Sequence, residues 1–242
     1  MPAAPSARFA HLAFDLDGTL VDTSADIAAA LNVALTAVGR EPLPVGDVVL
    51  HVGEGARRLV EQALGAADVA LVDRATTLFL DHYARHVLDV SRPYPGIVEA
   101  LAALAEAGSV CTVLSNKPEA LTRAIVSGLG LSRFVAAVIG GDSLPVRKPD
   151  PRGLWELCTL VGVAPAATLV VGDSLIDAAT ARAAGAAFCG VAWGFGRDAL
   201  EQAAIAPLLQ RPGDLVTFVA GERPADGAQA GRAGSGAARS EA

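Results

Sequence analysis

Two apolar segments that lie far apart in this 242-residue sequence each lead into a pair of aspartates. The first pair is Asp15 and Asp17, and the second pair is Asp173 and Asp177. Each apolar segment has the length and composition of a buried strand. An unpaired charge is costly to bury, so carboxylates at strand ends are poor core material. Both pairs are explained if the two strands lie side by side and the acids meet around a metal ion.

The second half of the chain alternates between short apolar strands and amphipathic helices. After a first strand at 9–14, strands are expected at 110–114, 135–139, 168–171 and 187–191, and helices at 97–107, 119–128, 152–161 and 175–184. Such alternation indicates βαβ units joined by right-handed crossovers, with helices on both faces of a mostly parallel sheet. The predicted fold class is α/β, with a doubly wound, mostly parallel, Rossmann-like core.

A helical block interrupts this alternation directly after the first strand. Helices are expected at 25–38, 57–64 and 69–87, with a loop marked by Pro42, Pro44 and Gly46 and with no convincing strand. We interpret residues 23–90 as an inserted helical cap domain, and residues 1–22 together with 91–220 as the α/β core domain. Residues 221–242 are mostly Gly and Ala and are expected to form a disordered tail.

Composition excludes several classes of protein. The formal net charge is −7 and no block of Lys and Arg occurs, which argues against non-specific nucleic-acid binding. Cys111, Cys158 and Cys189 are too far apart for a zinc motif and too few for a disulfide framework, so we expect buried thiols in a reducing cytoplasm. Neither a signal peptide nor a membrane span is evident in the sequence, and we expect a soluble protein.

The polar residues with chemical potential gather at one edge of the predicted sheet. Ligands in open α/β sheets bind beyond the carboxyl ends of the strands. The candidate residues each follow a strand or lie in the loop after one, and they are Asp15, Asp17, Ser115, Asn116, Lys148 and Asp173. Stability alone does not readily explain why independent segments would converge there.

These residues suit the chemistry of a phosphate ester. Asp15 and Asp17 are two positions apart and would face the same side of an extended strand end. One could attack phosphorus, which divides a difficult hydrolysis into two easier steps, while the other serves as acid and then base. Mg²⁺ would screen the repulsion between the nucleophile and the anionic substrate. Asp15, Asp173 and a backbone carbonyl near Asp17 would bind it, with Asp177 binding directly or through water.

Each motif also has a structural interpretation. The segment from Asp15 to Gly18 could be a simple turn, although not an EF-hand loop, because Leu20 stands where that loop needs Gly. Asp173 and Asp177 could cap a helix. Ser115-Asn116-Lys117 could bind phosphate oxygens at a helix N-terminus or only cap that helix, with Pro118 in its first turn.

Two further candidates are weak when taken alone. A single lysine such as Lys148 is usually a solvated surface residue, and it gains weight here because clustered carboxylates and phosphate need a cation. His82 and His86 have a spacing that could bind metal, but we favour a surface position for both.

Together, the motifs resemble those of the haloacid-dehalogenase-like hydrolase superfamily over residues 9–197. The matching motifs are Asp15 to Thr19, Ser115, Lys148, and Gly172 to Asp177, in that order. The insertion between the first and second motifs is similar to the small α-helical cap class of that superfamily. Several stretches also resemble the phosphoglycolate phosphatases, namely residues 14–23, 52–56, 115–118, 139–145, 148–151 and 171–174.

This resemblance implies a role for each matching residue. Asp15 is expected to be the nucleophile, Asp17 the general acid and base, and Lys148 a catalytic cation that also binds phosphate. The cap loop 53–58 is expected to select the leaving group. The candidate substrate-binding residues are Thr19, Gly53, Arg57, Ser115, Asn116 and Lys148, and the candidate metal ligands are Asp15, Asp17, Asp173 and Asp177.

The resulting expectation is a Mg²⁺-dependent phosphatase that acts on a small phosphorylated metabolite such as 2-phosphoglycolate through an aspartyl-phosphate, as a monomer or homodimer. The alternatives are a sugar phosphomutase of the same superfamily or a phosphatase for another small metabolite. Thr19 disfavours the phosphomutase, because mutases of this type often carry an aliphatic residue at that position. Dehalogenation and phosphonate cleavage are disfavoured by Asp17. A non-catalytic binding protein on the same scaffold is disfavoured by the complete set of acids.

Overall fold

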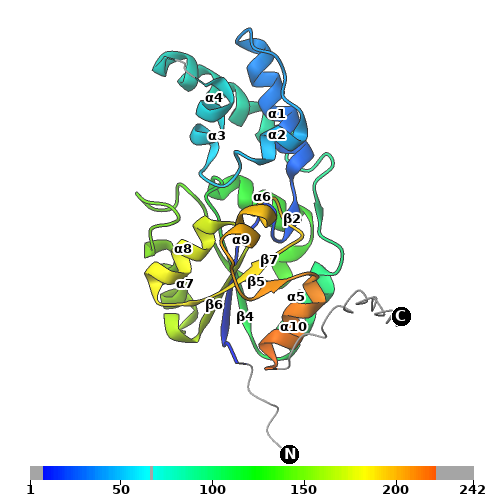
Figure 1. Ribbon diagram of the computed structural model, residues 1–242, viewed down its shortest axis with the longest axis vertical. Helices are drawn as coiled ribbons and strands as arrows, with labels where there is room; N and C mark the ends of the chain where they lie inside the picture. Colours follow the sequence, from blue (N-terminus) through cyan, green and yellow to red (C-terminus); the bar gives the residue numbers. More distant parts are fainter. Residues whose placement is uncertain (1–7, 66–67, 222–242) are drawn as a thin grey trace, which may run out of the picture.

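The computed structural model describes residues 8–65 and 68–221. The expected disordered tail therefore lies outside the described residues, apart from Gly221. One six-stranded parallel sheet organises the lower half of the molecule in Figure 1, with the strand order β5-β4-β1-β6-β7-β8. The strands are β1 (His11–Phe14), β4 (Val110–Leu114), β5 (Val135–Ile139), β6 (Thr168–Gly172), β7 (Ala187–Val191) and β8 (Leu208–Leu209). This arrangement confirms the predicted α/β class.

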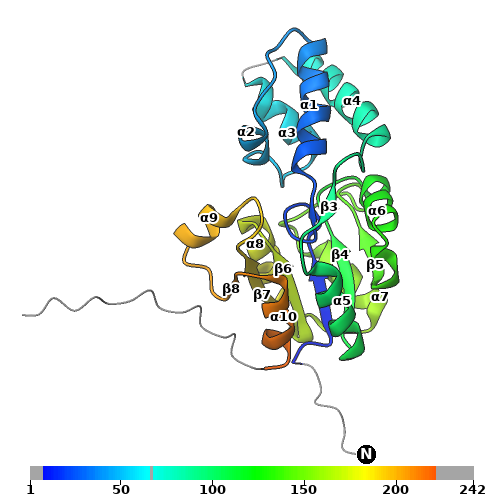
Figure 2. The same ribbon diagram turned by 90° about the vertical axis from the view of Figure 1, so that its right-hand side faces the viewer.

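Helices pack on both faces of the sheet because successive residues of each strand point to opposite sides. Leu12 and Phe14 of β1 belong to a large core shared with α5 (Ile97–Glu106), α6 (Glu119–Gly128) and α10 (Pro212–Val219). Ala13, between them, belongs to a second core shared with α7 (Arg152–Val161) and α8 (Leu175–Ala184). Figure 2 shows α5 and α10 together on one side of the sheet.

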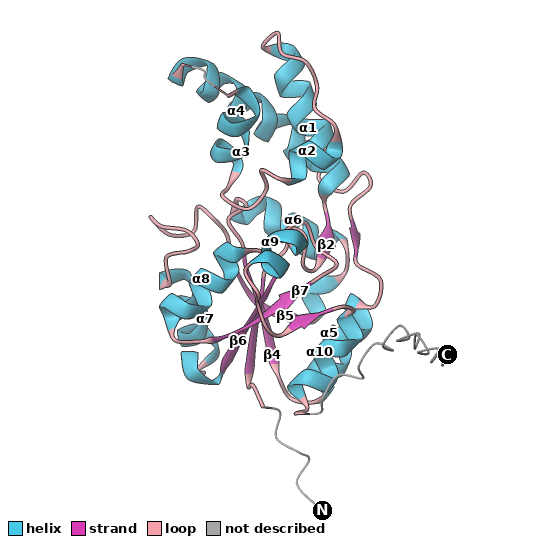
Figure 3. Cartoon of the chain, in the orientation of Figure 1, coloured by secondary structure: helices cyan, strands magenta, loops and turns pink. Residues whose placement is uncertain are grey.

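The inserted block consists of four helices that stand beyond the carboxyl edge of the sheet (Figure 3). They are α1 (Ser24–Ala37), α2 (Val45–Val49), α3 (Ala56–Leu64) and α4 (Val69–Arg85), and we call this block the cap. Two short antiparallel strands, β2 (Val21–Asp22) and β3 (Arg92–Pro93), join the cap to the core. The chain thus leaves and re-enters the core through adjacent segments.

Several short elements differ from the expectations. The region marked by prolines contains α2, which begins at Val45 immediately after Pro44, so the prediction of a plain loop there was wrong. The elements β2, β3, β8 and α9 (Arg197–Gln202) were not expected from the sequence, and neither were α10 and two 3-10 turns at Leu131–Arg133 and Pro165–Ala167. None of the described helices is long and apolar enough to cross a membrane.

Candidate active site

The parallel pairing of β1 and β6 brings the two aspartate pairs together. Phe14 pairs with Val171 in the register, and the N–H of Asp15 donates to the Val171 carbonyl at 2.9 Å. One oxygen from each of Asp15, Asp173 and Asp177 lies within 4.8 Å of the others, and all three residues are buried. The two distant motifs therefore form one acidic cluster at the carboxyl edge of the sheet.

Asp173 is held by backbone groups of the loop between β7 and α9. Its Oδ2 accepts hydrogen bonds from the N–H of Phe195 at 2.7 Å and of Gly196 at 3.2 Å. A Cβ at Gly18 or Gly194 would overlap the Asp173 side chain, so only glycine permits this close approach. The segment 193–196 is thus a clamp on the Asp173 carboxylate.

Thr19 lies beneath this clamp. Its hydroxyl donates to Asp173 Oδ1 at 3.3 Å, and its carbonyl accepts from the indole N–H of Trp193 at 3.0 Å. The Thr19 side chain is fully buried, and the residue is not among those that line the active-site cavity. These contacts favour a role in orienting Asp173 over a direct contact with substrate.

Lys148 is the central cation of the acidic cluster. Its Nζ lies 3.0 Å from Asp15 Oδ1 and 2.6 Å from Asp177 Oδ1, and the residue is only 5% exposed. Burial works to lower the pKa of Lys148, but the carboxylates of Asp15 and Asp177 outweigh it and raise the pKa, so the side chain stays charged. Asp177 also accepts from the N–H and hydroxyl of Ser174, which places it at the start of α8.

The three carboxylates of the cluster together carry more negative charge than the single positive charge of Lys148 can neutralise. Burial raises the pKa of Asp15 to about 6 even though Lys148 opposes the shift, and Asp177 and Asp17 add to it. Burial, followed by repulsion from Asp15 and Asp177, raises the pKa of Asp173 to about 7. Asp15 Oδ1 is occupied by Leu16 N–H and Lys148, while Oδ2 has no recorded partner among the described residues. Buried oxygen ligands with excess negative charge fit a hard divalent cation.

Asp17 lies beside this cluster in a separate set of contacts. It accepts from the Thr23 hydroxyl at 2.6 Å and forms an ion pair with Lys117 through the same Oδ1 atom. Its side chain, a candidate metal ligand from the sequence, does not belong to the three-carboxylate group. Asp17 also lines the cavity, where a general acid for a bound ester would have to lie.

Ser115 and Asn116 follow β4 at the same edge. The N–H of Ser115 donates to the Ile139 carbonyl at 3.0 Å, and its hydroxyl accepts from the N–H of Lys117 at 3.3 Å. Asn116 Nδ2 donates to the carbonyls of Gly53 at 2.8 Å and Lys148 at 3.0 Å. Asn116 therefore connects the cap loop to the Lys148 loop, and both Ser115 and Asn116 also line the active-site cavity.

A cavity of about 370 Å³ lies between the cap and the carboxyl edge of the sheet. Its floor contains Asp15, Asp17, Ser115 and Asp173. Gly53, a candidate substrate-binding residue, lines it from the cap loop. Its cap wall is mainly apolar and consists of Ile27, Val49, Leu50, Val52, Ala56, Leu59, Phe79, Leu80 and Tyr83, with Gly53 and Gly55.

The structure places Arg57 away from this cavity. The guanidinium is exposed and pairs with Glu61 at 3.0 Å and with Asp73, so α3 directs it toward the outer side of the cap. Arg58 is similarly exposed and lies near Glu54 and Glu61. The histidines suspected of binding metal, His82 and His86, stack with ring centroids 4.3 Å apart, and His86 pairs with Asp89.

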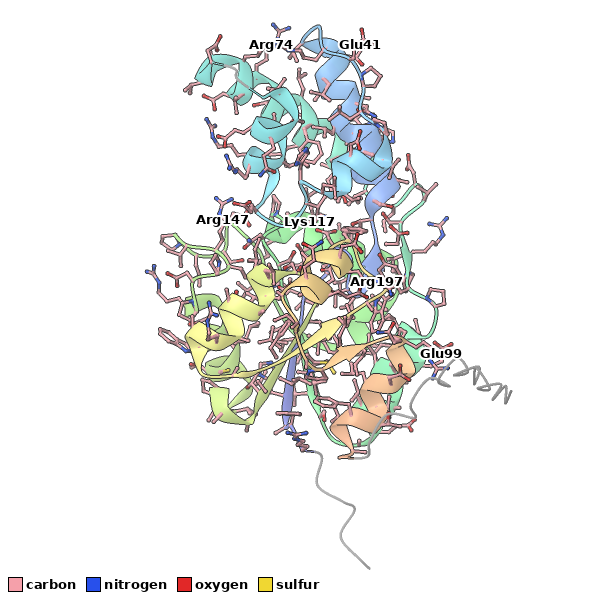
Figure 4. The ribbon with its side chains drawn as sticks, in the orientation of Figure 1. Glu41, Arg74, Glu99, Lys117, Arg147 and Arg197 are labelled. Atoms are coloured by element: carbon pink, nitrogen blue, oxygen red, sulfur yellow. The ribbon has the colours of Figure 1, made fainter. Side chains whose placement is uncertain are left out.

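Sequence reasoning gave Lys117 no chemical role of its own. The structure buries it at the junction of cap and core, where Figure 4 labels it, and its Nζ contacts Asp17 and the Tyr83 hydroxyl of α4. The one sequence feature that pointed to a role in the site was its position directly after Ser115-Asn116. Its partners lie 100 and 34 positions away in the sequence, so only the fold reveals them.

Comparison with known proteins gives a consistent result. The model of the haloacid dehalogenase-like hydrolase family matches residues 9–185. The phosphoglycolate phosphatase of Mesorhizobium japonicum is 42% identical over 188 residues, covering 76% of this chain and 83% of the relative. That of Caulobacter vibrioides is 41% identical over 196 residues, covering 79% of this chain and 83% of the relative.

The fold agrees with solved structures as well. The crystal structure of a predicted phosphoglycolate phosphatase from Haemophilus somnus superimposes with a TM-score of 0.80 at 30% identity, and the match covers 87% of this chain and 98% of that one. The matched family region contains all four motifs and the whole acidic cluster. On this combined basis the chain belongs to the haloacid dehalogenase-like hydrolase family.

Proposed function

We propose that this protein is a Mg²⁺-dependent phosphatase that hydrolyses 2-phosphoglycolate through an aspartyl-phosphate on Asp15. The observation that carries the proposal is the convergence of Asp15, Asp17, Lys148 and Asp173 at one sheet edge beneath the cavity. The relatives named as phosphoglycolate phosphatases support the choice of substrate, because they match most of the chain at about two-fifths identity.

Each residue has a distinct task in this reaction. Lys148 and Ser115 bind oxygens of the phosphoryl group, and the carboxylate of Asp15 attacks phosphorus while the ester bond breaks. Asp17 gives a proton to the leaving oxygen and then removes one from the water that hydrolyses the aspartyl-phosphate. A bound Mg²⁺ held by Asp15, Asp173 and Asp177 would neutralise phosphoryl charge during this chemistry.

The cap has a supporting role in the proposal. Residues 23–90 form a lid whose apolar wall excludes water from the cavity, and motion about β2 and β3 admits substrate and releases product. Asn116 and Arg147 hold the lid through contacts to the carbonyls of Gly53 at 2.8 Å and Glu54 at 3.4 Å. The described cysteines are buried and free, which supports a reducing, cytoplasmic location.

A phosphate-release assay tests the function directly. The purified chain is incubated with 2-phosphoglycolate and a panel of small phosphomonoesters, each with Mg²⁺ and with chelator. We expect steady release of phosphate from 2-phosphoglycolate that requires Mg²⁺. Transfer of the phosphoryl group to a sugar without net release would instead indicate a mutase, and no turnover of any ester would contradict the proposal.

A further inference from the structure

Lys117 is a buried cation shared between the core and the cap. Its side chain is 5% exposed, and it forms an ion pair with Asp17 while donating to Tyr83 Oη at 2.9 Å. The ammonium also lies 4.8 Å from the centre of the Tyr83 ring, within the range of a cation–π contact. Lys117 therefore has a fixed position that depends on α4 of the cap.

Among the described residues that line the cavity, Lys117 is the only lysine or arginine. Lys148 pairs with Asp15 and Asp177 and serves the phosphoryl group in the proposed reaction, and Arg57 is paired with Asp73 outside the cavity lining. An ammonium carries three hydrogens, and two acceptors are recorded for Lys117 within the described part of the chain. One donor thus remains for a ligand in the cavity.

The contact with Asp17 fixes where that ligand group would lie. A general acid must come within about 3 Å of the ester oxygen that it protonates. Lys117 binds the same Asp17 carboxylate, so its ammonium lies close to the leaving group at the moment of proton transfer. A group on the carbon that bears the ester oxygen would therefore lie nearer this ammonium than a group farther along the substrate, which would meet the mainly apolar cap wall.

We propose that Lys117, positioned by Tyr83, selects substrates that carry a carboxylate on the carbon next to the ester oxygen. This inference rests on the proposed phosphatase function and specifies its substrate class, the 2-phosphorylated carboxylic acids. Lys117 is the specificity-determining residue because it contacts the substrate carboxylate. Tyr83 is a positioning residue, and because it belongs to α4, the recognition site is complete only when the cap is in place.

The test compares 2-phosphoglycolate with its uncharged amide, 2-phosphoglycolamide, which differs little in shape. The readout is the ratio of kcat/KM for the acid to kcat/KM for the amide. Any general damage to Asp17 or to the fold lowers both values and leaves the ratio unchanged. Loss of carboxylate recognition lowers only the first value and therefore moves the ratio toward one.

Three variants are measured with the wild type. In Lys117→Met we expect the ratio to fall by about 10- to 100-fold, the usual effect of losing a charge-assisted hydrogen bond. In Tyr83→Phe we expect a smaller fall of about 5-fold, because the ammonium stays but loses its anchor. Tyr94→Phe is the matched control, since it removes the other tyrosine hydroxyl of the chain away from the cavity lining, and it should keep the wild-type ratio.

The outcomes separate this inference from the proposed function. A wild type that prefers the acid while Lys117→Met and Tyr83→Phe keep that preference would overturn the inference and leave the phosphatase function intact. If Lys117→Met does not fold, the ratio in Tyr83→Phe decides alone. A folded wild type that hydrolyses neither ester would contradict the proposed function, and the inference would fail with it.

Discussion

The Nζ atom of Lys148 lies 2.6 Å from Oδ1 of Asp177, and both side chains are almost completely buried. The same ammonium lies 3.0 Å from Asp15, so one lysine holds the proposed nucleophile and a helix-capping acid together. Segments after β5 and β6 are thereby joined at the site.

Replacing Lys148 should affect both stability and activity. Lys148→Met leaves Asp15 and Asp177 buried without their cation, and breaking a buried pair in this way costs roughly 3–5 kcal/mol. We expect a lower free energy of unfolding in the absence of metal and loss of phosphatase turnover. Urea unfolding and phosphate release measure the two effects.

The control for this variant is a cation that pairs with an aspartate at the surface. Arg152 is exposed and lies 2.9 Å from Asp150, so Arg152→Met also removes one positive charge from an ion pair. Exposed pairs of this kind are screened by solvent and contribute little, so we expect little change in stability or turnover. An equal loss of stability in both variants would contradict the role given to the buried Lys148 bridge.

Asp173 should determine the response to divalent metal. Its raised pKa, about 7, reflects burial and the neighbouring carboxylates Asp15 and Asp177, and a cation would relieve this repulsion. Mg²⁺ should therefore raise the melting temperature of the wild type, because binding to the folded state stabilises it. In Asp173→Asn the metal-dependent shift should disappear. An equal shift in both proteins, measured by thermal unfolding across a Mg²⁺ titration, would place the metal elsewhere.

The clamp that residues 193–196 form on Asp173 can be tested separately. A Cβ at Gly194 would overlap both the Gly18 carbonyl and the Asp173 side chain, so Gly194→Ala must displace the clamp. Such overpacking costs about 1–3 kcal/mol, and we expect weaker Mg²⁺ binding by calorimetry as well. Gly213→Ala is the matched control, because no atom lies within 4 Å of a Cβ built there. Equal metal affinity in the two variants would argue against the clamp.

The buried imidazole of His11 should make the free energy of unfolding depend on pH. This effect does not involve the active site. The imidazole lies on the face of the sheet that α7 covers, between Thr168 at 3.1 Å and Thr112 at 2.7 Å, and burial lowers its pKa from 6.5 to about 4. The unfolded chain therefore binds a proton that the folded chain does not, and stability falls as the pH drops from 6.5 toward 4. Above pH 6.5 this contribution is fully present.

The size of this effect can be isolated with a variant. Between pH 7 and pH 5 the stabilisation from neutral His11 should decrease by about 2 kcal/mol. We expect the difference in free energy of unfolding between the wild type and His11→Gln to shrink by that amount over this range. A pH-independent difference between the wild type and His11→Gln would contradict a depressed pKa.

The sheet could be predicted from sequence because its strands are strongly apolar and regularly separated by helices. Four expected strands agree with β4, β5, β6 and β7 to within one residue, and the first is shorter, beginning at His11 rather than Phe9. The two-residue strands β2, β3 and β8 have too few positions for any periodicity to show. The helix α2 was missed because it is only five residues long, contains Gly46 and directly follows Pro44, a pattern typical of a loop.

The candidate site was predictable only in part. The register of β1 with β6 follows from a parallel sheet, and it brings Asp15 and Asp173 together. Lys148 could be proposed from the need for a cation, but its contacts to two carboxylates required the fold. Sequence alone does not tell whether either arginine of α3 faces the cavity, and in the structure both Arg57 and Arg58 are exposed and outside its lining. The contact between Lys117 and Tyr83 arises from tertiary packing, which local sequence patterns do not predict.

Trapping the proposed intermediate tests the central claim most directly. The wild type is mixed with Mg²⁺ and 2-phosphoglycolate, quenched in acid within milliseconds, digested and analysed by mass spectrometry, with Asp15→Asn as the matched control. We predict a phosphoryl group on the peptide that contains Asp15 in the wild type and no such adduct in Asp15→Asn, which should also release no phosphate. Phosphate release by Asp15→Asn at a rate near that of the wild type would contradict covalent catalysis by Asp15.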